Sequence, residues 1–157
     1  MAFLSSMNIV ASGLTAQQLR MDVVAENITN ATTTRTEKGG AYRRKMVVME
    51  AVDGRDDFRT EMARAQFRAN PHAVSNRNYQ NAGGVRVTQI AEDPSDFKRV
   101  YDPTHPDADE AGYVDLPNVD TIKEMADAMA ATQAYAANVT AFNTLKTLVS
   151  KGLEIGK

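Results

Sequence analysis

The first residues of the chain alternate apolar and polar positions at a helical period. Small and apolar side chains recur in steps of three and four between residues 4 and 28, which is the spacing of a coiled-coil seam. Asn and Thr crowd residues 27–34, and these residue types disfavour continuation of a helix. The pattern predicts a helix of about 26 residues. Its seam consists of Leu4, Met7, Ala11, Leu14, Gln18, Met21, Ala25 and Ile28.

A second helical pattern fills the end of the chain, where neither Gly nor Pro interrupts residues 119–151. Asp120 precedes the first apolar position and is suited to cap the start of this helix. The predicted length is about 33 residues, against a mean of about 11–12 in globular proteins, which indicates a coiled coil or an assembled shaft. The broad apolar face consists of Ile122, Met125, Met129, Ala136, Val139, Phe142, Leu145, Val149 and Leu153.

The middle of the chain has strand character instead. Glycine pairs at 39–40 and 83–84 introduce the runs AYRRKMVVME and VRVTQIAED, and a third short candidate, FKRVYD, stops at Pro103. Residues 51–82 have no clear period and predict a long loop or insertion, with a short helix at about 60–68.

These patterns predict an α+β fold, with two long terminal helices forming a coiled-coil-like pair and a small, irregular, β-rich middle region. We expect residues 1–34 and 117–157 to form one helical assembly domain. Residues 35–116 then form the middle region, with the loop or insertion at about 51–82.

Composition removes several classes of function. The chain has no Cys and two His, which excludes disulfides and thiolate sites and leaves little material for a His-based catalytic or metal site. The net charge of −2 gives no support for nucleic-acid binding, and no apolar stretch approaches the ~20 residues of a membrane span. The first basic residue is Arg20, so the basic region that opens a secretory signal peptide is not seen. We therefore predict no enzymatic activity, no cofactor and no direct membrane insertion.

One acidic cluster invites a metal-site interpretation. Five side chains with possible ligand atoms occur between residues 102 and 110, but their spacing does not match an EF-hand, and two prolines predict an extended, turning segment. We interpret these acids as solvated and predict no metal site. A small metal-dependent hydrolase that uses this cluster remains the weakest alternative. The cluster consists of Asp102, His105, Asp107, Asp109 and Glu110.

Charge is distributed unevenly, and the helices are long for the chain. Residues 35–68 hold nine bases and six acids, whereas residues 92–127 hold three bases and eleven acids. This asymmetry suits contact between unlike surfaces of related subunits, or simply a solvated face. Two such helices with few bulky residues cannot each bury a full apolar stripe inside one subunit. We therefore expect self-assembly through the terminal helices. The predicted interface residues are Leu4, Met7, Leu14, Met21, Ile28, Ile122, Met125, Met129, Ala136, Val139, Phe142 and Val149.

The run SGLTAQQLRMDVVAENITNATTT at 12–34 resembles the N-terminal signature of the bacterial flagellar axial proteins, the rod, hook and hook-associated subunits. Thr29 departs from the Ala that is usual in that family. The runs GGVRV, VYDP, HPDAD, GYV, PNV and AYAANV with a closing LEIG are similar to the proximal rod subunits. The resemblance covers residues 1–50 and 83–157. The matching signature positions are Ser12, Gly13, Leu14, Ala16, Arg20, Asn27, Ile28, Asn30, Ala31 and Thr33.

The resemblance implies a structural subunit of the basal-body proximal rod, the drive shaft that crosses the periplasm and transmits torque for motility. It implies export through the flagellar type III apparatus without a cleaved signal. The implied partners are copies of the chain, other proximal and distal rod subunits, and the rotor-side adaptor. The alternative is a helical-hairpin adaptor that binds one partner and does not polymerise.

Overall fold

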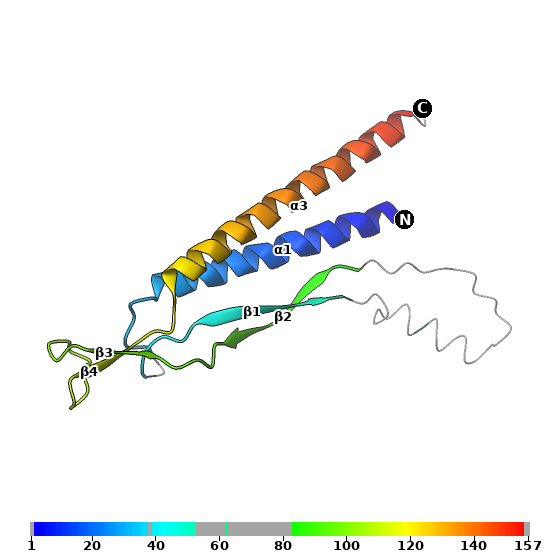
Figure 1. The fold of residues 1–157 in the computed structure, drawn as a ribbon. Coiled ribbons are helices and arrows are strands. Elements are labelled where there is room, and N and C mark those ends of the chain that lie inside the picture. The colour runs from blue at the N-terminus through cyan, green and yellow to red at the C-terminus, as the bar shows by residue number, and fades with distance from the viewer. Residues whose placement is uncertain (1, 38, 53–61, 63–82, 156–157) are drawn as a thin grey trace.

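A computed structural model describes residues 2–37, 39–52, 62 and 83–155 of the chain. Helix α1 (Ala2–Thr29) and helix α3 (Thr121–Ile155) lie side by side and antiparallel, with both chain termini at the same end of the molecule (Figure 1). The ribbon of strands β1 (Lys45–Ala51) and β2 (Val85–Glu92) runs beneath α1. Strands β3 (Lys98–Tyr101) and β4 (Tyr113–Leu116) lie at the opposite end from the termini. The predicted α+β architecture with two long terminal helices is confirmed.

The end of α1 and the start of α3 lie where the sequence signals predict, whereas α3 continues through Gly152 to Ile155. The Asp120 carboxylate accepts a hydrogen bond from the Ile122 backbone N–H at 3.1 Å and caps the start of α3. At the other boundary, the Asn30 side-chain amide donates to the Glu26 carbonyl at 2.9 Å and satisfies one carbonyl at the end of α1. In the turn that follows, the Thr33 backbone N–H donates to the Asn30 carbonyl at 3.1 Å, and the Thr33 hydroxyl donates to the Asn30 side-chain oxygen at 3.2 Å.

Small residues set the close approach of the two helices. A Cβ atom placed on Gly13 would lie 2.9 Å from the Asn138 side-chain nitrogen, so α1 and α3 are nearly in contact there. Ala16 on α1 is 3% exposed and Ala131 on α3 is fully buried. The buried face of α1 also includes Val23 and Val24. This face is not the predicted seam, because Ala11, Gln18 and Ala25 of the seam are exposed.

The middle region contains two separate antiparallel pairs. In the first, Val47 pairs with Ile90, and a register shift between Val48 and Met49 bends the β1–β2 ribbon as it follows α1. In the second, Tyr101 pairs with Tyr113. Three of these strands were predicted, whereas β4 was missed. The predicted loop at 51–82 and the short helix at 60–68 lie outside the described residues, apart from the edges of the loop and Met62.

Candidate assembly site

A buried polar junction joins the two helices to the middle region. Asn27 of α1 is 1% exposed and Glu124 of α3 is fully buried. The Asn27 amide donates to Glu124 at 3.0 Å and to the Lys45 carbonyl at 2.9 Å. Its side-chain oxygen accepts hydrogen bonds from the Tyr42 hydroxyl at 3.0 Å and from the Lys45 backbone N–H at 2.9 Å. One side chain therefore makes four hydrogen bonds to three residues of two separate segments, and its own polar atoms are satisfied.

The second carboxylate oxygen of Glu124 is bound by a cation from the middle region. The Arg44 Nε donates to it at 2.6 Å, and the Arg44 guanidinium also lies 3.5 Å from Asp93. Burial lowers the pKa of Arg44, but the hydrogen bond and charge of Glu124, with a further contribution from Asp93, outweigh burial and raise the pKa. The buried carboxylate is thus charge-paired, as burial of an ion requires.

Tyr42 completes the junction and carries a strong electrostatic signature. Burial, together with the negative charges of Glu26, Glu124 and Glu92, raises the pKa of the Tyr42 phenol to about 12. The neutral hydroxyl is the form that donates to Asn27. The junction therefore holds its shape with the Tyr42 hydroxyl protonated and the Arg44 guanidinium charged.

Several signature positions form the contacts that hold the fold together. The Ser12 hydroxyl donates to the Ile9 carbonyl at 2.7 Å and accepts from the Val85 N–H at 3.1 Å, which attaches β2 to α1. Arg20 makes an ion pair with Asp127 of α3 at 2.7 Å. The signature residues that pack or make hydrogen bonds and ion pairs within the subunit are Ser12, Gly13, Ala16, Arg20, Asn27, Asn30 and Thr33. The remaining signature positions, Leu14, Ile28 and Ala31, are half-buried.

The predicted interface residues of α1 lie on the flank of the helix pair. Met7, Leu14, Met21 and Ile28 are all half-buried within the subunit, and Leu4 lies among the residues whose side chains are not described. Met21 reaches α3, since the Thr132 hydroxyl lies 3.6 Å from its sulfur. One edge of the predicted α1 seam thus contacts α3 of the same subunit, and the other edge is exposed.

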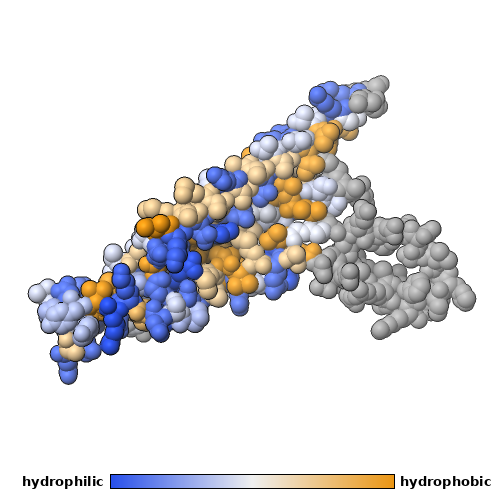
Figure 2. Space-filling model, viewed as in Figure 1, coloured by the Kyte–Doolittle hydropathy of each residue, from blue (hydrophilic) through white to orange (hydrophobic). Residues whose placement is uncertain are grey.

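The predicted interface residues of α3 divide into two groups. Val139, Phe142 and Val149 are half-buried. Ile122, Met125 and Met129 are 80%, 53% and 63% exposed, and Ala136 is also exposed. We call these four residues the outer face of α3. Met129 and Ala136 do not pack against α1 inside one subunit, because Glu124 and Ala131 occupy the face of α3 that does. The space-filling view shows extensive apolar surface along the helices (Figure 2).

The acidic segment that invited a metal interpretation folds as a series of turns. The Asp102 carboxylate accepts hydrogen bonds from the Thr104 hydroxyl and N–H, which lower the pKa of Asp102. Asp107 accepts from the Thr34 hydroxyl at 2.7 Å. Within the described part of the chain, no three His, Asp or Glu side chains are grouped so that they could hold a metal ion.

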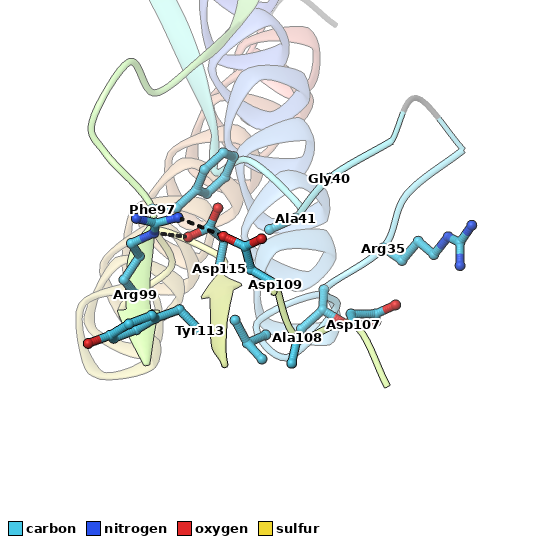
Figure 3. Close-up of a pocket in the computed structure, with 12 residues that line it drawn as sticks. Arg35, Gly40, Ala41, Phe97, Arg99, Asp107, Ala108, Asp109, Tyr113 and Asp115 are labelled. Carbon is cyan, nitrogen blue, oxygen red and sulfur yellow. Dashed lines mark hydrogen bonds and ion pairs between the residues drawn. The ribbon is translucent and has the colours of Figure 1, made fainter. Parts of the chain in front are cut away.

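A cleft of about 390 Å³ lies between this segment and the link that follows α1 (Figure 3). Arg99 sits on its wall and pairs with Asp115 at 3.0 Å and with Asp109 at 3.7 Å. Both acids are thereby held in ion pairs with Arg99, and the Asp107 carboxylate on the same lining accepts the hydrogen bond of the Thr34 hydroxyl. Among the described helices, none is long and apolar enough to cross a membrane.

Sequence reasoning did not find the partners of Asn27. Glu124 and Arg44 lie 97 and 17 positions away from it, and neither forms a recognisable motif with it. The available signal was an acid, Glu124, in the first turn of the C-terminal helix, directly after Lys123 and three residues before Asp127.

Comparison with known proteins gives consistent matches. Residues 7–35 match the family model described as the flagella basal body rod protein, and residues 110–155 match the model of the C-terminal part of the flagellar basal body rod FlgEFG proteins. The flagellar basal-body rod protein FlgC of Bacillus subtilis is 44% identical, over 97% of this chain and 97% of its own length. FlgC of Borreliella burgdorferi is 39% identical, over 99% and 98% of the two chains. FlgC of Escherichia coli O157:H7 is 37% identical over the whole of both chains.

Proposed function

Because the chain belongs to the FlgC family and is a structural subunit of the flagellar basal-body rod, we propose that it polymerises through the outward sides of its two terminal helices. One surface is the outer face of α3. The other is the open edge of the α1 seam, which includes Leu14, Met21 and Ile28. Val139, Phe142 and Val149 complete these contacts where α3 extends past the junction.

The observation that carries this proposal is the exposure of Met125, Met129 and Ile122 on one long helix. Removing a side chain of this size from water contributes about 1.5–3 kcal/mol. In a single subunit these side chains stay in contact with water. A neighbouring subunit that covers the outer face of α3 would remove them from water and so gain this free energy. The outer face and the α1 seam are different surfaces, so a contact between them is heterologous and need not close into a small ring.

The polar junction gives this assembly a mechanical role. It fixes the helix pair to β1 and to the link before it through buried, charge-paired hydrogen bonds. A load applied to the middle region therefore reaches the helices through a packed connection. We propose that this is how the subunit transmits torque as part of the drive shaft.

The subunit is a protein of the basal body. We propose that it occupies the part of the rod that crosses the periplasm. We further propose that it reaches that position through the flagellar type III export apparatus without a cleaved signal. Its neighbours there are copies of itself, other proximal and distal rod subunits, and the rotor-side adaptor.

A charge on the outer face tests the proposal. Met129→Asp leaves the subunit fold intact, because the side chain is already 63% exposed, and it blocks the contact with a neighbour by burying a charge. The matched control is Ile90→Asp, which adds the same charge to an exposed apolar position on β2. Cells that depend on Met129→Asp should make a folded chain but few basal bodies that contain it, and motility should be lost.

The outcome separates the two classes of function. Normal motility and normal incorporation with Met129→Asp and with Leu14→Asp would overturn assembly through these surfaces. A purified chain that stays a discrete monomer at every concentration, yet binds one partner, would favour the non-polymerising hairpin adaptor instead.

A further inference from the structure

The tip of the β3–β4 hairpin carries an exposed aromatic cluster, which the helical assembly does not use. Tyr101 is 63% exposed and Tyr113, directly opposite on β4, is 43% exposed. Arg99 lies two residues before Tyr101 and therefore on the same face of the hairpin. Figure 3 shows Arg99 beside Tyr113. We call these three residues the tyrosine tip. In the fold it lies at the end of the molecule opposite the two chain termini (Figure 1).

The tyrosine tip is held in a fixed arrangement although it is exposed. The two rings meet edge to face, with centroids 5.3 Å apart. A Cβ atom on Gly112 would lie 2.9 Å from the Tyr101 ring, and the φ of +78° at Gly112 is a conformation that favours glycine. The ring therefore rests directly on the backbone of the turn.

The cation of the tip is fixed in the same way. The Arg99 guanidinium lies 5.9 Å from the centre of the Tyr113 ring, and the carboxylates of Asp115 and Asp109 hold it there. Exposed ion pairs of this kind contribute little to stability. Their effect here is to fix the orientation of Arg99 and Tyr113 before any partner arrives.

Rigid, exposed Tyr and Arg side chains are typical of the residues that dominate protein–protein binding energy. Because their rotamers are already fixed, little conformational entropy is lost on binding. A two-stranded hairpin with four-residue strands has little stability of its own. The fold alone therefore does not explain why Arg99 and the two tyrosine rings are held in fixed positions.

The charge around the tip indicates the kind of partner. Residues 98–116 hold two bases and five acids, and four of the acids lie on the turn between β3 and β4: Asp102, Asp107, Asp109 and Glu110. We propose that the tyrosine tip inserts its rings into an apolar recess on a different protein, and that Lys and Arg residues line the rim of this recess.

A second copy of this chain is the less suitable partner. A recess of about 380 Å³ between α1 and β1 is lined by apolar side chains together with Arg20, Arg44 and Lys45. These three cations are already paired within the subunit, with Asp127, Glu124 and Glu26, so they are not free to meet the acids of the tip. The interface proposed here is therefore separate from the helix contacts that build the shaft, and it does not depend on them.

Photo-cross-linking in assembled basal bodies tests this inference. The full chain carries the photoreactive residue p-benzoylphenylalanine in place of Tyr101, and in a second variant in place of Glu110, which lies outside the ion pairs of Arg99. Irradiation of purified basal bodies should join both variants to a protein other than this chain, at an apolar residue with Lys or Arg beside it. When Glu110→Lys is combined with the photoreactive residue at position 101, the cross-link yield should fall at least about fivefold. The matched control, Glu37→Lys in the same variant, should change this yield less than about twofold.

Three results would overturn the inference: cross-links only to copies of this chain or to lipid, a partner site without basic residues, or a yield that does not respond to Glu110→Lys. Absence of the unmodified chain from basal bodies would instead refute the proposed rod function. The two failures are thus distinguishable, because incorporation and cross-linking are measured separately.

Discussion

Removing the Asn27 side chain is the sharpest perturbation of the polar junction. Asn27→Ala deletes four hydrogen bonds and leaves the Tyr42 hydroxyl and the Lys45 N–H and carbonyl without their side-chain partner. Each buried polar group that loses its partner costs about 1–3 kcal/mol. Lys45 is only half-buried, so water compensates part of its loss. We expect the free energy of unfolding to fall by about 3–5 kcal/mol, a large share of the about 5–15 kcal/mol of a typical domain.

Equilibrium unfolding in urea, followed by circular dichroism on monomeric full-length chain, measures this loss. Asn30→Ala is the matched control, since it removes the same side chain three positions later, where Asn30 makes two hydrogen bonds and is only half-buried. We expect a loss of about 1 kcal/mol for the control. If Asn27→Ala costs no more than Asn30→Ala, the junction does not hold the helices to the middle region and the reasoning fails.

Three further perturbations test individual contacts. The folded pKa of Tyr42 is raised to about 12, above its usual value near 10, so its contribution to the free energy of unfolding is complete below pH 10 and is lost as the pH rises through 12. An ultraviolet titration should show one late-ionising tyrosine that Tyr42→Phe removes. An early midpoint for all five tyrosines would contradict the burial of Tyr42. Gly13→Val should destabilise the helix pair by about 1–3 kcal/mol, because the added atoms meet Asn138, whereas Gly13→Ala should be nearly neutral, since its gain in helix propensity offsets the smaller overlap; thermal melts distinguish the two. Gly112→Ala should disorder the tyrosine tip without changing the helices, which NMR chemical shifts of the Tyr101 ring would report, and unchanged shifts would contradict the packing of that ring.

The helices and their boundaries were predictable because their causes are local. Periodic apolar positions, the Asp120 cap and the polar run that ends α1 all act within a few residues of one another. The packed face of α1 was not predictable in the same way. The large apolar residues favoured the seam, but the closest approach is set by the absence of side-chain volume at Gly13, Ala16 and Ala131.

The site was predictable only in part. The signature identified Asn27 and Arg20, but not what they bind. Glu124, Asp127 and the backbone of Lys45 come from distant segments, and such pairings depend on tertiary geometry. Strand β4 was missed because YVDL is short and contains an acid, and its pairing with β3 is what gives it strand geometry.

A subunit map of isolated basal bodies by electron cryomicroscopy tests the central claim most directly, namely that this chain assembles through the outward sides of its terminal helices. We predict that Met125 and Met129 of α3 and Leu14 and Met21 of α1 lie at contacts between subunits, with the junction of Asn27 and Glu124 intact inside each subunit. A map in which these four apolar residues face solvent, and neighbouring subunits meet elsewhere, would contradict the account.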